Sequence, residues 1–380
     1  MVATVSPGLV SGNDRRESTA WDDVERQFRG QLSPLRLFPG AALAVYQRGR
    51  LVLDLGDGYA DTRRGERVRV DSLFPLFSGA KPFAAVALWQ QIERGHLGLD
   101  QPVAAHWPAF GQNGKDRVLV RHILSHRGGF PTTPGDLTPD RWGDRKAVLA
   151  AVAAMPLEHA PGAVSAYHFL TQHWVCGELL HRLDGRTYPD YLRQEITAPL
   201  GLSDTYVGLP VSLEHRVAKL HATDGTDEWG LDGLRQMSQI ALHRMVTPGA
   251  SGVSTARDMA RFYAALAAGG ALDGSRILQP ETVARMLAVE VDGETDATFA
   301  APVRRGLGFE LGGLADPRRH WPGSTSTIRT FWHGGFGSSV CWGDSDLDLS
   351  MAFLTNGVRR DEAGAIARRD LSDAVRSGGG

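Results

Sequence analysis

The order of strand-like and helical segments along the chain is the feature that most constrains its fold. Residues 39–61 read as two strands joined by a turn with the sequence QRGR, and further strand-like pieces follow residue 300. The segment from about residue 100 to 250 has a helical and loop-rich pattern instead. Consecutive strands joined by short turns favour antiparallel pairing. We therefore expect an α+β fold in which both chain ends form one antiparallel sheet covered by helices, beside a mainly helical second lobe.

The same pattern predicts where these parts begin and end. We expect a flexible N-terminus over residues 1–18, a sheet lobe made from residues 19–99 and 250–375, and a helical lobe over residues 100–249. A cleft between two lobes is a common place for a ligand site, so we expect the functional residues there.

Composition and charge exclude several classes of function. The chain has 380 residues and a net charge of -2, without long runs of one sign, which argues against a nucleic-acid surface. No apolar run approaches the roughly 18 residues of a membrane helix, and the N-terminus lacks a signal-peptide pattern. Cys176 and Cys341 are far apart, have no metal spacing and read as buried thiols. We expect a cytoplasmic protein that binds neither nucleic acid nor membrane, and the sequence leaves its oligomeric state open.

Lysine is rare in this chain, which has four lysines against 37 arginines. One of the four, Lys81, follows Ser78 by three residues, and a helix is predicted to start near Ser78 and to end at Gly95. That spacing places both side chains on one helix face, with Cβ atoms about 5–6 Å apart. Arginine cannot lose its proton in a protein, whereas a buried lysine can. Lys81 is therefore a candidate base for the Ser78 hydroxyl.

Several further segments carry a resemblance to a known family. The stretch LFSGAKPF resembles the Ser-x-x-Lys motif of the serine β-lactamase-like hydrolases, and VRHILSHRGGF resembles a turn of that family. The segment that begins YHFLTQHWVCGELL resembles its second motif, and HGGFGSS resembles its third. The order of the motifs agrees with the family over about residues 20 to 357, and within it the chain is most similar to the family VIII carboxylesterases.

This resemblance implies roles for individual residues. Ser78 would be the acylated nucleophile, and Lys81 and Tyr167 would share the proton transfers, with the primary base left open between them. The backbone N–H groups of Ser78 and Phe336 would form the oxyanion hole. His333, Gly334 and Gly335 form the third motif, where the glycines would let the strand lie close to the substrate.

Three aromatic residues near these motifs are further candidates for substrate contact. His168 follows Tyr167 and either lines the cleft or packs in the core. Together with Phe336, Trp332 and Trp342 lie near the third motif and could form an apolar wall for an acyl group.

Two departures from the family pattern bear on the substrate. The second motif is commonly Tyr-x-Asn, but here its third residue is Phe169, and the third motif is commonly Lys-Thr-Gly, but here it begins with His333. A neutral imidazole attracts the carboxylate of a β-lactam less than an ammonium group does. These changes disfavour a β-lactamase or D-amino peptidase and favour a carboxylesterase acting on short-chain or aromatic esters.

Two alternatives stay open beside the esterase. An acyltransferase would pass the same acyl group, from an ester or an acyl thioester, to an alcohol or amine. A non-catalytic ligand-binding sensor would not need Ser78, Lys81 and Tyr167 together. No cofactor or metal is expected: His122 and His126 have helical spacing but no third ligand, and the sequence lacks Gly-x-Ser-x-Gly, phosphate-loop and dinucleotide-binding patterns.

Overall fold

A computed structural model describes residues 12–33, 36–133, 135–239, 241–314 and 322–379. Its largest element is a nine-stranded antiparallel sheet with the order β10-β11-β12-β13-β14-β15-β1-β2-β3. The first strand of the chain therefore pairs with one of the last, β15, as the sequence predicted for the two ends. The α+β fold with an antiparallel sheet from both chain ends is confirmed.

The strands of this sheet differ widely in length. They are β1 (Gly40–Gln47), β2 (Arg50–Asp61), β3 (Glu66–Arg67), β10 (Val291–Asp296), β11 (Ala301–Arg305), β12 (Glu310–Leu311), β13 (Thr330–Gly335), β14 (Ser339–Asp344) and β15 (Leu349–Thr355). Smaller sheets contain β4 (Phe74–Pro75), β5 (Tyr206–Val207), β6 (His221–Ala222), β7 (Gly252–Ser254), β8 (Ala271–Leu272), β9 (Ser275–Arg276) and β16 (Gly357–Val358).

Between and beside the strands, the described chain also contains helices. They are α1 (Gly12–Leu32), α2 (Lys81–Glu93), α3 (Val103–His106), α4 (Val120–Leu124), α5 (Arg145–Ala154), α6 (Thr171–Asp184), α7 (Tyr188–Leu192), α8 (Glu228–Gln239), α9 (Ala256–Ala267), α10 (Pro280–Met286) and α11 (Glu362–Gly379). Short helical turns are η1 (Phe77–Ala80), η2 (Pro108–Arg117), η3 (Pro139–Arg141), η4 (Arg193–Thr197), η5 (Val211–Arg216) and η6 (Leu242–Arg244).

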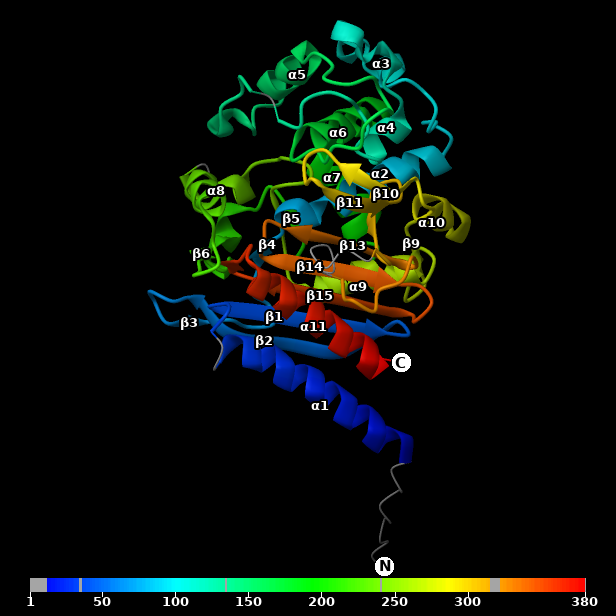
Figure 1. Cartoon of the computed structure of the whole chain (residues 1–380). Coiled ribbons are helices and arrows are strands. Elements are labelled where there is room, and N and C mark those ends of the chain that lie inside the picture. The colour runs from blue at the N-terminus through cyan, green and yellow to red at the C-terminus, as the bar shows by residue number, and fades with distance from the viewer. Residues whose placement is uncertain (1–11, 34–35, 134, 240, 315–321, 380) are drawn as a thin grey trace, which may run out of the picture.

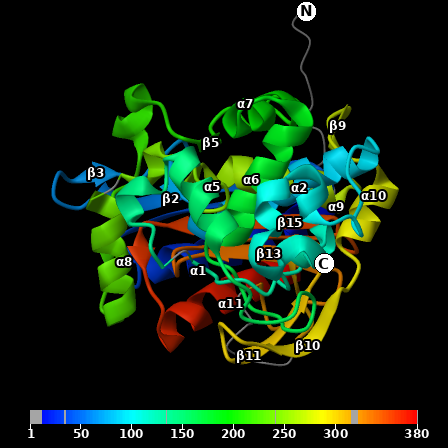
Figure 2. The same cartoon turned by 90° about the horizontal axis from the view of Figure 1, so that it is seen from above.

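Side-chain alternation in the central strands buries both faces of the sheet. In β1, Ala41, Leu43 and Val45 belong to one buried cluster and Ala42, Ala44 and Tyr46 to the other. The helices α1 and α11 cover the first face, and α9 packs across β1, β14 and β15 on the opposite face. The helices α3 to α7 stand beyond the sheet, away from α1 and α11 (Figure 1). Seen from above, α8 and α10 lie at opposite edges of the molecule (Figure 2).

Local sequence signals fix several of these boundaries. The β1–β2 turn has positive φ angles at Arg48 and Gly49, the combination that a two-residue hairpin turn needs. Helix α6 ends at Gly185, which has a φ of 87°. Helix α9 begins after Thr255, whose side chain accepts a hydrogen bond from the Asp258 N–H.

The structure differs from the sequence prediction in three places. Residues 12–18, expected to be flexible, form the first part of α1, whereas residues 1–11 lie outside the described residues. The helix expected to start at Ser78 begins with the 3₁₀ turn η1, and regular α-helix starts only at Lys81. The hairpin of β10 and β11 was not predicted, because β10 is an edge strand whose four central residues are exposed and therefore do not alternate between apolar and polar.

Two whole-chain expectations can be compared with the structure. Among the described residues, no helix combines the length and the apolar character that crossing a membrane requires. Cys176 and Cys341 are both free and buried, as predicted for core thiols.

Candidate active site

Ser78 and Lys81 lie next to one another at the start of α2. Ser78 belongs to the 3₁₀ turn η1, and Lys81 is the first residue of the α-helix that follows. In a 3₁₀ turn, side chains three residues apart eclipse one another. Lys81 Nζ accordingly lies 3.1 Å from Ser78 Oγ. The turn thus places an amine within hydrogen-bond distance of a hydroxyl that it could deprotonate.

Lys81 is held by backbone carbonyls and is almost fully buried. Its side chain donates hydrogen bonds from Nζ to the carbonyl oxygens of Phe169, at 2.8 Å, and Gly249, at 2.9 Å. Lys81 is 1% exposed, and this burial lowers its pKa to about 7. A carbonyl oxygen can only accept, so these two partners fix two N–H groups of the amine. In the neutral amine, the remaining lone pair faces Ser78 Oγ.

The imidazoles around Lys81 are weaker bases than this amine. Burial lowers the pKa values of His126 and His173 well below the ordinary histidine value, and it lowers those of His168 and His333 to about 4. These four groups are therefore neutral at neutral pH. Since a general base works best when its pKa lies near the working pH, Lys81 is better suited to accept the Ser78 proton than any of them.

Tyr167 lies beside the same amine on the loop that leads into α6. Lys81 Nζ is 5.4 Å from the centre of its ring. The ring stacks on His126, with centroids 4.6 Å apart, and is 4% exposed. Its centre lies 6.1 Å from that of His333 on β13. The structure thus brings together Ser78, Lys81, Tyr167 and His333, which come from three distant parts of the chain.

Gly335 allows β13 to approach the Ser78 turn. A Cβ atom at this position would lie 2.0 Å from the carbonyl oxygen of Leu76 and 2.8 Å from Ser339 Oγ, which is closer than real atoms come. Any larger residue would therefore push β13 away from η1. His333, two residues earlier on the same face of the strand, donates from Nδ1 to the Gly334 carbonyl at 2.8 Å, which leaves Nε2 as an acceptor.

Two phenylalanines adopt backbone conformations that residues other than glycine rarely adopt. Phe77, directly before Ser78, has a φ of 49°, and Phe336, directly after Gly335, has a φ of 44°. Their rings contact one another, with centroids 5.3 Å apart. Strain of this kind costs about 1–3 kcal/mol per residue and persists where the surroundings enforce it. Both strained residues border the two amide groups, of Ser78 and Phe336, that the resemblance assigns to the oxyanion hole.

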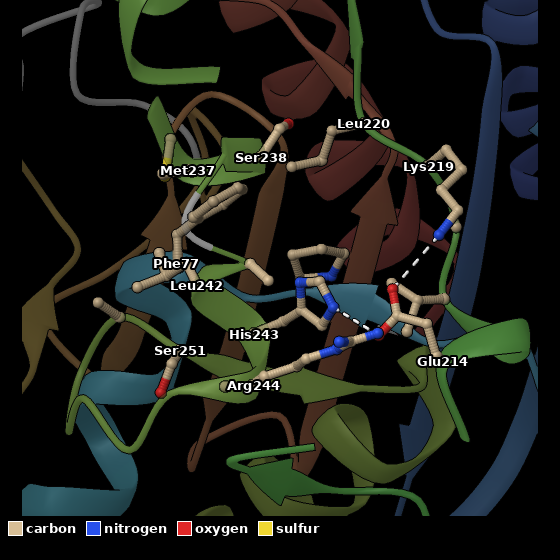
Figure 3. A pocket seen from close by; sticks show the side chains of 16 residues that line it. Phe77, Glu214, Lys219, Leu220, Met237, Ser238, Leu242, His243, Arg244 and Ser251 are labelled. Atoms are coloured by element: carbon tan, nitrogen blue, oxygen red, sulfur yellow. Dashed lines mark hydrogen bonds and ion pairs between the residues drawn. The ribbon is translucent and has the colours of Figure 1, made fainter. Parts of the chain in front are cut away.

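A cavity of about 270 Å³ adjoins this site, and Phe77 forms part of its wall (Figure 3). The hydrophobic side chains of Met237 and Leu242 lie near Phe77 on one side of the cavity. On the other side, the Glu214 carboxylate accepts hydrogen bonds from His243 Nε2 at 2.7 Å and Arg244 Nε at 3.1 Å, and Lys219 Nζ at 3.5 Å pairs with it. One end of the cavity is therefore apolar, and the other contains charged groups that already neutralise one another in part.

Other residues singled out from the sequence lie away from Ser78. Trp332 and Trp342 pack with Val340 in the cluster under α1 and α11, on the face of the sheet opposite His333, because neighbouring strand residues alternate between faces. Trp332 and Trp342 therefore do not form the predicted apolar wall, whereas Phe336 contacts Phe77 beside Ser78. Gly334 lies on the same face of β13 as Trp332. His168 Nε2 donates to the Phe130 carbonyl at 3.0 Å, and His168 is 1% exposed, so it packs in the core.

Sequence reasoning missed several contributors to the site. The carbonyls of Phe169 and Gly249 hold Lys81, and backbone groups leave no signal in residue type. Phe299, at the tip of the β10–β11 hairpin, places its ring 4.7 Å from that of Tyr167. Its aromatic side chain in an otherwise polar segment of the sequence was the available signal. Among the described side chains, no group of His, Cys, Asp and Glu is arranged to hold a metal ion.

Comparison with known proteins gives matches over most of the chain. The profile of the family described as Beta-lactamase matches residues 22–375. Esterase/beta-lactamase LipL of Mycobacterium tuberculosis (strain ATCC 25618 / H37Rv) is 29% identical over 382 residues, which cover 90% of this chain and 84% of LipL. A penicillin-binding protein homolog from Caulobacter crescentus is 30% identical with a TM-score of 0.84, over 98% of this chain and 99% of that one. A family VIII carboxylesterase is 26% identical with a TM-score of 0.82, over the same shares of the two chains.

Proposed function

We propose that this chain, which belongs to the beta-lactamase family and is an esterase-like serine hydrolase, cleaves short-chain or aromatic esters. The proposed reaction proceeds through an acyl-enzyme on Ser78. The observation that carries the proposal is the setting of Lys81, which is buried, has a pKa of about 7, and lies 3.1 Å from the Ser78 hydroxyl. A nucleophilic serine needs an adjacent base with such a pKa.

The proposed reaction uses the groups in a fixed order. Neutral Lys81 accepts the Ser78 proton while Oγ attacks the ester carbonyl, and the N–H groups of Ser78 and Phe336 stabilise the resulting oxyanion. The Lys81–Tyr167 pair returns the proton to the departing alcohol, which leaves Ser78 acylated. Water then attacks the acyl-enzyme and gives a proton to the same pair. The pair passes this proton to Ser78 Oγ as the acyl C–O bond breaks, which releases the carboxylic acid and restores free Ser78 and neutral Lys81.

The site would lie between the two proposed lobes. Ser78 and Lys81 come from the segment 19–99, Tyr167 from the segment 100–249, and His333 and Phe336 from the segment 250–375. The side chains of Ser78, Lys81, Tyr167 and His333 lie close together although they come from these three segments. Each proposed lobe thus contributes at least one side chain to the site, which supports this division.

The charge of the site favours esters over β-lactams. His333 occupies the position of the usual lysine, and its pKa of about 4 leaves it neutral at working pH. A β-lactam carboxylate would therefore find no cation there. The apolar side of the cavity beside Phe77, with Met237 and Leu242, offers space for a small hydrophobic acyl or alcohol group.

Hydrolysis of p-nitrophenyl butyrate and of nitrocefin, by the wild-type protein and Ser78→Ala, tests this proposal. We expect the ester to be turned over much faster than the lactam, and Ser78→Ala to lose both activities while its circular dichroism spectrum and melting temperature stay unchanged. Comparable rates on the two substrates would refute the ester preference, and a folded Ser78→Ala protein with more than a few per cent of activity would refute the nucleophile. Added alcohols that accept the acyl group would show transfer beside hydrolysis.

A further inference from the structure

The β10–β11 hairpin holds Tyr167 at three points. The Tyr167 N–H donates to Asp296 Oδ1 at 3.2 Å, and the Thr298 hydroxyl donates to the Tyr167 carbonyl at 3.0 Å. The Phe299 ring lies 4.7 Å from the Tyr167 ring, on the same hairpin tip. The loop that carries Tyr167 has no regular secondary structure, so these contacts, together with the stacking of the ring on His126, help to fix where the ring lies.

Asp296 is the centre of this arrangement. Besides the Tyr167 N–H, its Oδ1 accepts the N–H groups of Thr298 at 3.0 Å and Phe299 at 3.1 Å. Its Oδ2 accepts from Arg305 Nη1 at 2.7 Å and from the Ser165 hydroxyl at 3.3 Å. Asp296 is fully buried. One carboxylate thus ties the hairpin tip to the loop at Ser165 and at the Tyr167 N–H.

Arg305 connects this carboxylate to the sheet. Its Nη1 also donates to Ser165 Oγ at 2.7 Å, and its Nε donates to Glu310 on β12 at 2.8 Å. Its Nη2 has no hydrogen-bond partner, whereas its Cζ lies 5.8 Å from the centre of the Tyr167 ring, within the range of a cation–π contact. Because β12 pairs with β13, which carries His333, the connection runs from Tyr167 to the strand on the other side of the site.

Stability alone does not explain a buried ion pair of this kind. Arg305 is 1% exposed and Glu310 is 5% exposed, so all three charges are removed from water. The cost of desolvation often cancels the attraction between buried charges, and apolar replacements of such pairs are often as stable. Arg305 donates to both Asp296 and Glu310, and such a network does fix the positions of the groups that it joins. In this protein, the network fixes the loop that carries Tyr167, the residue assigned to proton transfer.

We propose that Asp296 and Arg305 are positioning residues that hold Tyr167 in its place for proton transfer between Ser78, Lys81 and the leaving group. This inference rests on the proposed role of Tyr167. Catalysis is sensitive to such positioning, because a misplacement of about 1 Å can cost on the order of 100-fold in rate. The hairpin would therefore contribute to kcat without contacting the substrate through either charged residue.

A double-mutant cycle between Asp296 and Tyr167 tests the inference. We expect Asp296→Ala to lower kcat about 10- to 100-fold with KM changed less than about threefold. In the Tyr167→Phe background, the same Asp296→Ala change should lower kcat less than about threefold, because the residue through which it acts is already impaired. Additive losses in the two backgrounds would overturn the inference. A Tyr167→Phe protein with wild-type kcat would instead overturn the proposed role of Tyr167.

Two further variants keep the test decisive if Asp296→Ala folds poorly. Thr298→Val keeps the shape of the side chain but removes the hydroxyl that donates to the Tyr167 carbonyl, and we expect kcat to fall roughly threefold to tenfold in a fully folded protein. Glu178→Gln is the matched control, since the Glu178 carboxylate is also buried and accepts from Arg145 and Arg182 but lies on α6 away from these residues. An equal loss of kcat in Glu178→Gln, or an unchanged kcat in Thr298→Val, would contradict positioning by the hairpin.

Discussion

Two buried lysines in this chain differ in their third hydrogen-bond partner. Lys115 is fully buried and donates to the carbonyls of Gln112, Ala153 and Met155. Lys81 donates to two carbonyls, and its third partner is the Ser78 hydroxyl. Three carbonyls can only accept, so Lys115 needs all three protons, whereas Lys81 can exchange one with a hydroxyl. The third partner therefore separates a structural lysine from a candidate base.

The sequence could predict one of these lysines and not the other. Scarcity of lysine marks both equally, and only the Ser-x-x-Lys spacing distinguished Lys81. The structural role of Lys115 depends on carbonyls at the end of α5, about 40 residues away in the chain, and no residue type records them.

The pH dependence of the reaction follows from the pKa of Lys81. Burial lowers this pKa to about 7, and only the neutral amine can accept the Ser78 proton. We therefore expect kcat/KM for a p-nitrophenyl ester to rise with pH along a limb centred near 7 and to level off above it. Steady-state rates between about pH 5.5 and 8.5, corrected for uncatalysed hydrolysis, measure this limb. A flat profile over that range would contradict a base with the pKa of Lys81.

The same pKa makes a prediction about stability. The folded protein holds the Lys81 proton less tightly than the unfolded chain does, so between about pH 7 and 10 the unfolded state binds more protons, and rising pH favours folding. The fall of the pKa from 10.5 to about 7 corresponds to a free energy on the order of 5 kcal/mol. Denaturant unfolding of the wild type and Lys81→Met should show their difference in unfolding free energy moving in favour of the wild type as pH rises through this window. A difference that is independent of pH would mean that the amine is not perturbed by burial.

At the scale of elements, the site depends on how closely β13 approaches η1. The sequence predicted the strand and its glycines, but it could not show which glycine the approach requires. The structure assigns this requirement to Gly335, where a Cβ atom would meet the Leu76 carbonyl at 2.0 Å. The β10–β11 hairpin was missed for a different reason. Pro302 and the exposed, charged residues of β10 are typical of a sheet edge, where hydrophobic alternation is weak.

Substitution of Gly335 tests this close approach. Gly335→Ala should displace β13 and Phe336 from Ser78 and lower kcat on the order of 100-fold, because the added methyl group overlaps a backbone oxygen that cannot move aside. Gly79→Ala is the matched control, since a Cβ there meets only ordinary contacts at 3.6 Å, beside the same Ser339 hydroxyl. Ester hydrolysis by the two purified variants provides the comparison. Similar activities in the two variants would show that the close approach of β13 to η1 does not limit ester hydrolysis.

At the scale of the whole molecule, the fold joins the two chain ends and thereby assembles the site. Pairing of β1 with β15 places the strands β13 and β14 next to the segment that carries Ser78 and Lys81. The motifs were readable in sequence because each is a short local pattern of residue types. Their three-dimensional setting, with a backbone carbonyl of Phe169 in contact with Lys81 and a buried carboxylate behind Tyr167, depends on long-range packing that residue types alone do not specify.

The central claim is that Lys81 activates Ser78 because it can lose its proton. The most direct measurement is the rate at which Ser78 becomes acylated in Lys81→Arg, followed by intact-mass spectrometry after mixing with a p-nitrophenyl ester. Arginine keeps the positive charge, but its pKa above about 12 prevents it from serving as a base. We predict that acylation slows about 10²- to 10⁴-fold relative to the wild type, in a variant that melts normally and still binds a non-reactive inhibitor. Acylation of folded Lys81→Arg within about tenfold of the wild-type rate would contradict the account.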